Sequence, residues 1–470
     1  MTRINTNMLS LVAQRSLIAA GATLSQTLER LSTGYRINRA SDDPSGLIAS
    51  EQLRSEIVAL DAAIGNATRA ANIIGTAEGG LEEINTLLLD IQGYVDEAAN
   101  AGGMTDEEIA ANQLMIDEAV ASINRIAANT QFNSRQLLDG TSGFNTNGVE
   151  SAELSSVVVN QATFDGTQDA ITYNIDATTA EKAKVTMAAA AIATADGVVT
   201  IQGNKGTAQV TFSAGMTQAQ VIDAVNAVAS QTGVAAVADG ADIDFRSDEY
   251  GASQLVNFTR VGGATFTLSD DQDYGANATV TSIDGTADGI SVEGLKVTVK
   301  RSNLDMEIVI ADDTVVQAAG DFNIEQGGLR FQIAPQVGPT GQVSIGIRSV
   351  NANYLGDVVT GFLSSLTSGG DNDLDSGNLT TAASIASTAI DQVVNLRGRM
   401  GAVQRNTLET AVRSMGSALV SITGAESAIR DADFAAETAN LTRAQILLQS
   451  GISALAVAAT ASMNVLTLLT

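Results

Sequence analysis

Residues 53–98 read LRSEIVALDAAIGNATRAANIIGTAEGGLEEINTLLLDIQGYVDEA. Apolar side chains recur along this stretch at alternating steps of four and three residues, the heptad spacing that lines one face of a helix. The expected seam comprises Leu53, Ile57, Leu60, Ile64, Ala67, Ala71, Ile74, Ala77, Leu81, Ile84, Leu88, Ile91, Val95 and Ala98. The spacing predicts a slip of three residues around Ile74 to Leu81, which would overwind a coiled coil locally. Since about 50 helical residues extend over roughly 75 Å, this rod needs partner helices along its length.

Further amphipathic helices are expected at both ends of the chain. Gly34 is expected to end the first helix, and Asp43 followed by Pro44 to begin the second. Thr105 and Glu108 form a capping-box pattern for a third helix. The apolar stripes of these end segments contain Leu17, Ala20, Leu24, Leu28, Leu31, Leu396, Met400, Val403, Val412, Met415, Leu419, Ile422, Ile446 and Leu455.

The two helical ends match in period and length, which favours packing against each other. We therefore predict a fold that is mainly α at both termini, with long coiled-coil helices from the N- and C-terminal segments packed together. An inserted outer region of α+β or mainly β structure separates them. Two unrelated helical domains are the alternative.

The chain ends are unusually apolar. Ala444 to Thr470 carries no charge, and the first 40 residues carry five arginines and one acid. Chain ends are usually polar and frayed, so these faces must be buried on each other, on copies of the chain or in a membrane. A spanning helix needs about 20 predominantly apolar residues, whereas the longest apolar run of the tail is 454–459. This favours the first two destinations and predicts no membrane partner.

The middle of the chain, 141–378, has a different texture. Short alternating runs such as 198–201, 209–212 and 295–299 are bounded by Gly, Asp and Asn and predict strands. Thr217 and Gln220 predict the start of one short helix. We expect two subdomains, at about 180–260 and 261–350.

Composition excludes several function classes. The chain has no Cys and no His, which rules out disulfides, thiol chemistry, histidine zinc sites and imidazole-based catalysis. Its net charge of -28 makes nucleic acid and anionic membranes poor partners. We recognise no nucleophile–base pair or phosphate-binding loop, so we expect neither an enzyme nor a cofactor.

One weak metal candidate remains. Asp371, Asp373 and Asp375 resemble the start of a calcium-binding loop, but Gly377 is one place late and Ala382 stands where a bidentate Glu belongs. A solvated linker into the C-terminal helix is the preferred interpretation.

Several motifs resemble those of bacterial flagellins. At the N-terminal end they are LSTGYRIN (31–38), ASDDPSGL (40–47), INRIA (123–127), NTQFN (129–133) and LLDG (137–140). At the C-terminal end they are LRGR (396–399), IRDADFA (429–435), ETANL (437–441) and AQIL (444–447). The resemblance covers about 1–140 and 380–470. Residues 198–258 more loosely resemble a small strand-and-helix module found inside many flagellins.

The resemblance implies a structural subunit that self-assembles into the helical flagellar filament for swimming. Its partners would be further copies of itself, hook–filament junction and filament cap proteins, and an export chaperone. It would leave through the flagellum-specific type III export channel, without a cleaved signal peptide, and lie outside the cell. The alternatives are a surface adhesin or carbohydrate-binding homologue and a minor hook–filament junction protein.

The same resemblance implies five parts. These are an inner-tube helix and connecting loop (1–43), an N-terminal coiled-coil segment (44–140), the outer region (141–378), a C-terminal coiled-coil segment (379–433) and a C-terminal inner-tube helix (434–470).

The chain departs from the family that it resembles at one recognition site. Many flagellins are bound by a Toll-like receptor through a stretch resembling Arg-x-Arg-Glu-Leu, together with a Glu on the next helix. The corresponding positions here hold Asp90, Gln92, Gly93, Tyr94 and Met115. The key arginine is replaced by an acid, and charge reversal at an interface replaces attraction with repulsion. We therefore expect weak or absent receptor recognition.

Overall fold

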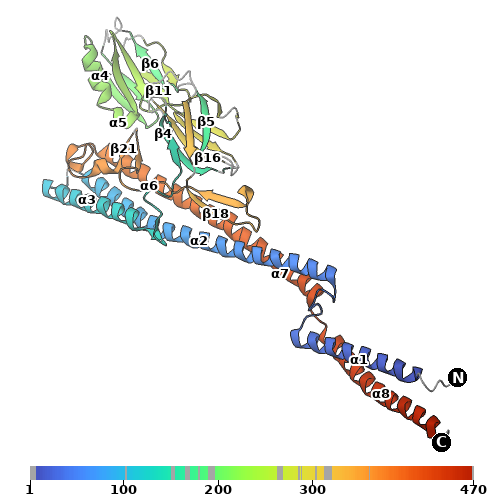
Figure 1. The fold of residues 1–470 in the computed structure, drawn as a ribbon. Helices are drawn as coiled ribbons and strands as arrows, with labels where there is room; N and C mark the ends of the chain where they lie inside the picture. The colour runs from blue at the N-terminus through green and yellow to red at the C-terminus, as the bar shows by residue number, and fades with distance from the viewer. Residues whose placement is uncertain are drawn as a thin grey trace. The chain divides into compact units, whose positions relative to one another are not determined.

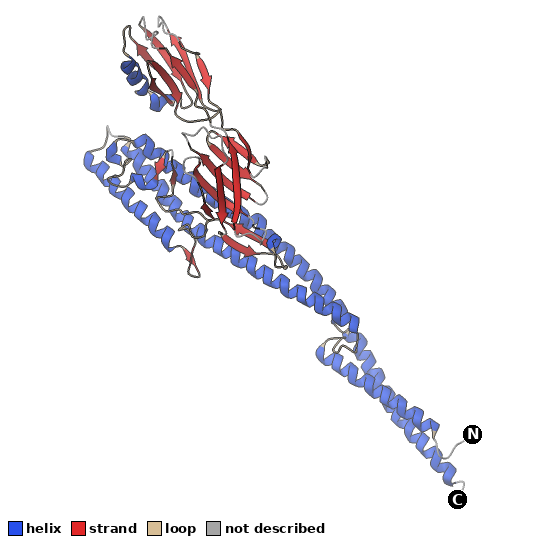
Figure 2. Cartoon of the chain, turned by 45° about the horizontal axis from the view of Figure 1, so that its top comes forward, coloured by secondary structure: helices blue, strands red, loops and turns tan. Residues whose placement is uncertain are grey.

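A computed structural model describes residues 7–100, 103–149, 154–162, 164, 170–177, 180–188, 196–261, 268–283, 286, 288–301, 304–311, 320–325, 327–358 and 360–467. Its α-helices are α1 (Met8–Thr33), α2 (Pro44–Ala98), α3 (Asp106–Asn129), α4 (Gln218–Asn226), α5 (Ala229–Thr232), α6 (Leu379–Ala402), α7 (Glu409–Arg430) and α8 (Phe434–Thr467) (Figure 1). The strands of the described residues all lie between α3 and α6 in sequence; Figure 2 draws them in red. The predicted fold class, helical termini with a strand-rich insertion, is confirmed.

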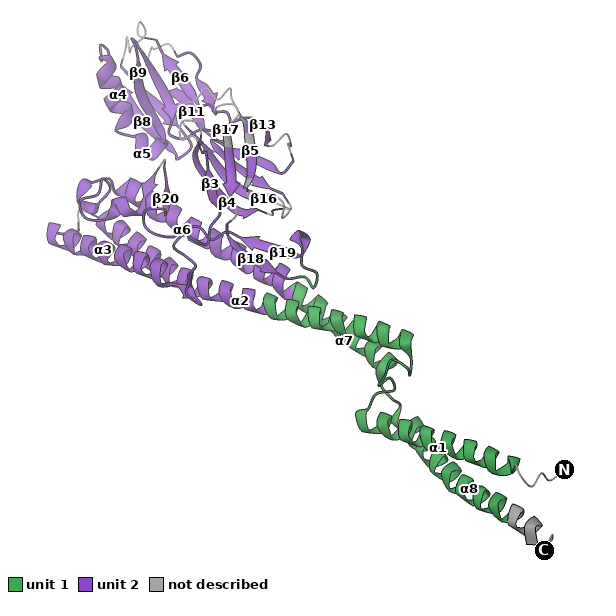
Figure 3. Ribbon diagram, viewed as in Figure 1, with its two compact units in different colours: residues 1–66, 334–336, 410–470 green, residues 67–333, 337–409 purple. Residues whose placement is uncertain are grey.

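The chain forms two compact units (Figure 3). The first contains residues 1–66, 334–336 and 410–470, and the second contains 67–333 and 337–409. Each unit therefore combines segments from both halves of the sequence. Helix α2 begins in the first unit and continues into the second.

The predicted helix boundaries follow from local chemistry. Gly34 ends α1 in the left-handed conformation, with φ at 78°, and donates its N–H to the Arg30 carbonyl. Pro44 is the first residue of α2, where its missing N–H costs no helical hydrogen bond. Thr105 and Glu108 form the expected capping box at the start of α3, and Thr217 and Gln220 form another at α4.

The buried stripe of α2 is regular, and the predicted slip is wrong. Its buried residues are Leu60, Ala63, Ala67, Ala70, Ile74, Ala77, Leu81, Ile84, Leu88, Ile91, Val95 and Ala98, which alternate in steps of three and four without a break. Ala63 and Ala70 occupy positions that we gave to Ile64 and Ala71, which are only partly buried. Spacing alone favoured the larger Ile64, whereas the packed seam takes its smaller neighbour.

The C-terminal helices contain the irregularity instead. Residues Ala382, Ala386, Ala389, Val393, Leu396 and Met400 are buried at heptad spacing along α6. The stripe continues at the partly buried Val403 and then at Leu408, a step one residue longer than the heptad permits. A π turn, Val403–Leu408, covers that step and joins α6 to α7. Since a π turn holds one extra residue within a helix, it keeps Leu408 in phase with the buried stripe of α6.

Helices α2, α3 and α6 build the helical core of the second unit. Their buried apolar side chains form one cluster with Leu137, Leu138 and a set from the later chain: Leu329, Ile345, Ile347, Val350, Ala352, Leu355, Leu363, Leu366 and Leu374. The later set lies within the strands β18 (Leu329–Gln332), β19 (Gln342–Ile345), β20 (Gly356–Asp357) and β21 (Gly361–Phe362) and the turns between them. The segment 329–374 therefore belongs to the helical body rather than to the outer region, where we had placed it.

Two four-stranded antiparallel sheets share the next core. One has the order β13-β5-β17-β3, with β13 (Val280–Ile283), β5 (Ala170–Ala177), β17 (Gly320–Glu325) and β3 (Asn145–Asn147). The other has the order β14-β15-β16-β4, with β14 (Ile290–Glu293), β15 (Lys296–Lys300), β16 (Leu304–Ile310) and β4 (Leu154–Ala162). Buried side chains from both sheets, including Phe322 and Ile308, form a single cluster. This is a β-sandwich.

A separate strand-and-helix module lies between β5 and β13 in sequence. Its sheets are β6-β10-β9 and β12-β11-β7-β8, and α4 and α5 accompany them. The strands are β6 (Lys184–Met187), β7 (Gly197–Gln202), β8 (Thr207–Phe212), β9 (Val234–Asp239), β10 (Asp242–Ser247), β11 (Leu255–Val261) and β12 (Gln272–Tyr274). The module has its own core, which includes Phe212, Val221 and Phe245.

The strand pairing corrects the division that we drew at residue 261. The first subdomain extends through β12, and the sandwich is built from both flanks of that module, 145–177 and 280–325. Strand β4 pairs with β16, and β5 pairs with β17, across more than a hundred residues. Sequence alternation identifies strands but does not reveal such distant partners.

The π turn yields the first prediction. Deleting the exposed Asn406 should shorten the step from Val403 to Leu408 to the heptad value, convert the turn to α-helix and leave the melting temperature unchanged or raised. Deleting the exposed Asn395 within regular α6 should instead put the two halves of the stripe out of phase and lower the melting temperature by several degrees. Thermal unfolding followed by circular dichroism compares the two deletions. An equal loss in both would contradict the role assigned to the π turn.

Candidate assembly surface

Helices α1 and α8 lie side by side in the first unit (Figures 1 and 2). The predicted stripe residues Leu17, Leu24 and Leu31 of α1 are partly buried, as is Leu455 of α8. The fully buried positions of this pair are small or polar: Ala20, Thr27, Glu437, Ala444 and Ala458. Between the two helices, small or polar side chains are thus completely buried and leucines only partly.

Large apolar side chains remain exposed on the same two helices. Leu9 is 73% exposed and Ile18 is 64% exposed on α1, and Ile446 is 61% exposed on α8. We define the outward apolar face as Leu9, Val12, Ile18, Leu28, Ile446, Leu447, Ile452 and Val457. Ile446, predicted as a seam residue, therefore does not face α1. Exposed apolar surface of this extent marks an interaction site.

The linkers next to these helices are tied together. The Arg36 N–H donates to the Arg430 carbonyl at 2.7 Å, and the Ala432 N–H donates to the Gly34 carbonyl at 2.9 Å. The Arg430 guanidinium lies 4.6 Å from the centre of the Tyr35 ring and 3.2 Å from a Glu51 carboxylate oxygen. Arg430 thus joins both linkers to the first turns of α2.

The loop between α1 and α2 is held by two carboxylates. Asp42 accepts backbone N–H groups from Arg39 at 2.9 Å and Asn38 at 3.1 Å. The hydrogen bond from the Arg39 amide holds the pKa of Asp42 below its usual value. Burial opposes this shift, while the Asn38 amide and the Arg30 charge reinforce it. Asp43 accepts the Gly46 N–H at 2.9 Å, which caps α2.

The other predicted seam residues differ in burial. Leu60 is 4% exposed, Leu81 and Leu88 are completely buried, and Leu396 is 1% exposed. The remaining ones are partly buried: Leu53, Ile57, Ile64, Val403, Leu419 and Ile422. Each of these partly buried side chains keeps some exposed surface that a helix of another molecule could cover.

Polar residues that sequence reasoning did not single out hold the segment after β21 against α3. The Gln113 side-chain amide donates to the Leu366 carbonyl at 2.8 Å and accepts the Leu374 N–H at 2.9 Å. Asp117 accepts the Ser368 N–H at 2.8 Å. Burial raises the pKa of Asp117, but the hydrogen bonds from Ser368 outweigh it and hold the pKa below its usual value. Helical spacing cannot identify Gln113, because a polar residue in an apolar stripe carries no signal of its distant partners.

One of the three calcium candidates, Asp373, is used within the protein. The two carboxylate oxygens of Asp373 accept the N–H groups of Gly369 at 3.0 Å and Ser376 at 2.8 Å. Leu374, between the candidate ligands, is 5% exposed and packs into the helical core. Among the described residues, no group of three or more carboxylates is arranged to hold a metal ion. The arrangement is that of a capped turn.

The positions equivalent to the receptor site lie on α2 and α3. Asp90 and Gly93 are exposed, and Met115 on α3 is 51% exposed. Gln92 and Tyr94 are partly buried, and Tyr94 packs against the helical core.

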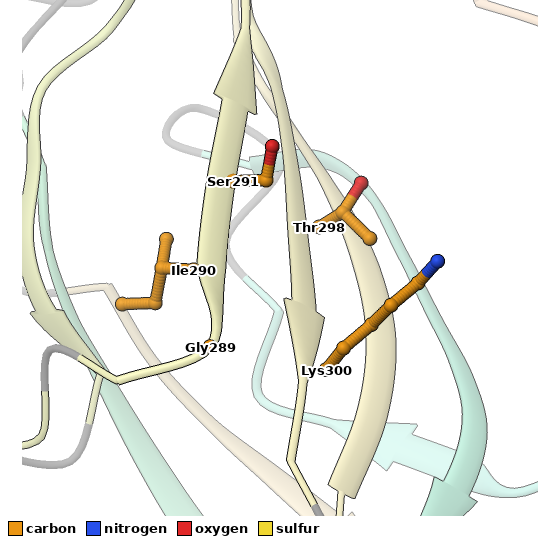
Figure 4. A pocket seen from close by; sticks show the side chains of 5 residues that line it. All are labelled: Gly289, Ile290, Ser291, Thr298 and Lys300. Atoms are coloured by element: carbon orange, nitrogen blue, oxygen red, sulfur yellow. The ribbon is translucent and has the colours of Figure 1, made fainter.

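Neither a surface hollow on the sandwich nor the described helices indicate a catalytic or membrane-spanning site. An open hollow on β14 and β15 is lined by Gly289, Ile290, Ser291, Thr298 and Lys300 (Figure 4); these side chains include no pair suited to catalysis. In the described part of the chain, no helix has both the length and the apolar character needed to cross a membrane.

Comparison with protein families finds three matches. The bacterial flagellin N-terminal helical region matches residues 4–143, and the bacterial flagellin C-terminal helical region matches 383–469. The flagellin hook IN motif matches 198–249, within the strand-and-helix module.

Similar proteins span the whole chain. A flagellin of Salmonella typhimurium is 27% identical over 521 aligned positions, covering 99% of both chains. Flagellin A of Helicobacter pylori is 25% identical, covering 100% of this chain and 99% of its own. Polar flagellin F of Vibrio parahaemolyticus is 40% identical over 140 positions, covering 30% of this chain and 37% of its own.

The buried seam yields the second prediction. Leu88→Asp places a carboxylate in the helical core and should lower the free energy of unfolding by about 3–5 kcal/mol. Leu89 is the adjacent residue of the same type but is 51% exposed, so Leu89→Asp should change stability by less than about 1 kcal/mol. Denaturant unfolding of the two purified monomers measures both. Equal stability of the two variants would show that the seam is assigned to the wrong face.

Proposed function

Because this chain belongs to the bacterial flagellins and is a structural subunit of the flagellar filament, we propose that its copies meet through the outward apolar face of α1 and α8. Flagellins self-polymerise, and the filament lies outside the cell. The observation that supports the proposal is the exposure of Leu9, Ile18 and Ile446 on helices whose mutual contact uses small residues. Further copies of the chain would remove this apolar surface from water.

We extend this proposal to the five parts expected from the sequence. Segments 1–43 and 434–470 would form the inner tube, and 44–140 and 379–433 the coiled-coil layer around it. The sandwich and its inserted module would form the outer region. The whole role is structural, and we assign no catalytic step to any part.

The same proposal includes binding partners and a route of export from the cell. Hook–filament junction and cap proteins would contact the subunit at the filament's two ends, and an export chaperone would cover the terminal helices before assembly. We propose export without a cleaved signal peptide.

The assembly role yields the third prediction. Removing 444–470 should leave the second unit folded, because its helical core contains no residue of α8. It should stop filament growth, because the deletion removes all of α8's share of the outward apolar face. Electron microscopy after seeding purified monomer measures growth, and limited proteolysis checks that the second unit stays folded. Normal filaments from this truncation would rule out the proposal.

We also propose that the chain evades the Toll-like receptor that binds many flagellins. The exposed Asp90 supports this, because an acid stands where the recognised stretch has arginine. A receptor that binds an arginine presents an acidic group to it. An aspartate at the same position repels that group and leaves it unpaired.

This proposal yields the fourth prediction. Purified monomer should activate receptor-expressing reporter cells far less than a strongly recognised flagellin, and Asp90→Arg should restore part of the signal. Asp96→Arg is the matched control, since Asp96 is an exposed acid on the same helix outside the equivalent site. Full potency of the parent protein, or equal gains from both variants, would contradict the assignment.

A further inference from the structure

Helices α1 and α8 run antiparallel in one continuous register. Arg30 faces Glu437, with the guanidinium nitrogen 3.1 Å from the carboxylate oxygen. A Cβ atom placed on Gly21 would lie 3.9 Å from Leu448, and one placed on Gly451 would lie 3.2 Å from Leu17. At the far end the Asn7 side chain donates to the Ala458 carbonyl at 2.8 Å. The partners of successive α1 residues, from Asn7 to Arg30, thus run backwards along α8 from Ala458 to Glu437.

Apolar packing defines this register only weakly. The buried apolar residues between the helices are Ala20, Ala444 and Ala458, and Gly21 and Gly451 lie beside them. Small residues at heptad-like spacing offer similar contacts when one helix slides past the other by a heptad. The partly buried leucines of the pair recur every seven residues, Leu17, Leu24 and Leu31 on α1 and Leu441, Leu448 and Leu455 on α8. A slip of one heptad therefore brings most of them to equivalent positions on the other helix.

Charged side chains distinguish the observed register of α1 and α8 from registers that are slipped by a heptad. The α1 sequence contains the charged residues Arg15, Glu29 and Arg30, and α8 contains Glu437 and Arg443. Glu437 is the only buried charged residue in the described part of the first unit, at 7% exposure. The Arg30 Nε is also buried and has no hydrogen-bond partner among the described residues.

We propose that the Arg30–Glu437 ion pair is the residue pair that specifies the α1–α8 register, and through it the placement of the outward apolar face. A slip of one heptad separates the two groups in either direction. A buried carboxylate without its guanidinium is strongly destabilising, whereas the alanine contacts survive the slip. A single buried polar pair fixes the register of coiled coils in the same manner.

The proposal rests on the assembly role of α1 and α8, and cross-linking tests it separately. The chain has no cysteine, so two introduced thiols are unambiguous. Gly21→Cys/Leu448→Cys reports the observed register, and Gly21→Cys/Leu441→Cys and Gly21→Cys/Leu455→Cys report slips of one heptad. Each pair is joined with a short bismaleimide in filaments made mainly of parent subunits, so that the cross-links form within one chain.

In the parent sequence, only the Gly21/Leu448 pair should cross-link efficiently. In a Glu437→Gln background, this pair should lose most of its yield, and one of the slipped pairs should gain. The matched control is Arg443→Gln, an exposed position on the same helix, which should leave all three yields unchanged. Retention of the parent pattern in Glu437→Gln would overturn the proposal.

A charge exchange gives an independent measurement. Arg30→Glu and Glu437→Arg alone should each abolish most seeded filament growth, and the combined exchange Arg30→Glu/Glu437→Arg should restore a large part of it. Failure of the double variant, with both single variants defective and the second unit folded, would show that the pair's geometry rather than its charge matters and would overturn the proposal. Filament growth after removal of 444–470 would instead refute the assembly role itself.

Discussion

The structure depends on a constraint imposed by helix α2: an apolar stripe that continues from Leu60 to Ala98 must be covered along its whole length. A helix of this length cannot fold back on itself, and burying one side chain such as Leu88 contributes about 1.5–3 kcal/mol. Within the second unit the cover comes from α3 and α6, and from the segment 329–374 that precedes α6. The C-terminal half of the sequence therefore completes a core that the N-terminal half begins.

The same constraint explains the irregularities. The buried stripe of α6 continues to Leu408, which belongs to the helical core, although the sequence holds one residue too many between Val403 and Leu408. The π turn accommodates that residue and keeps Leu408 in phase with α6. In the first unit the opposite situation holds, because α1 and α8 bury only small or polar side chains completely and leave large residues such as Leu9, Ile18 and Ile446 exposed. The subunit is thus closed along α2, α3 and α6 and open along α1 and α8.

The strand-rich part of the chain is built as one insertion within another. The sandwich is inserted between Leu138 and Leu329, both of which belong to the helical core, and the strand-and-helix module is inserted in turn between two strands of the sandwich. Each level has its own core. The chain leaves and re-enters the helical body at neighbouring positions, since the Gly328 N–H donates to the Gly143 carbonyl at 2.8 Å. The insertion can therefore fold on its own core without breaking the packing of the helices.

The sequence by itself determined the helices, their caps at Gly34, Pro44 and Thr105, and the bacterial flagellin family, because these depend on spacing and on short local motifs. It also indicated that the chain ends need partners. Tertiary structure alone decided that Ala63 and Ala70 enter the seam in place of larger or equal neighbours, that β4 pairs with β16 across the inserted module, and that Gln113 holds the segment before α6. It alone showed which α1 and α8 residues face each other and which face outward. The physical reason is the same in each case: helical periodicity fixes a face only to within about one residue, and the final choice depends on the shape and polarity of a partner that lies far away in the sequence.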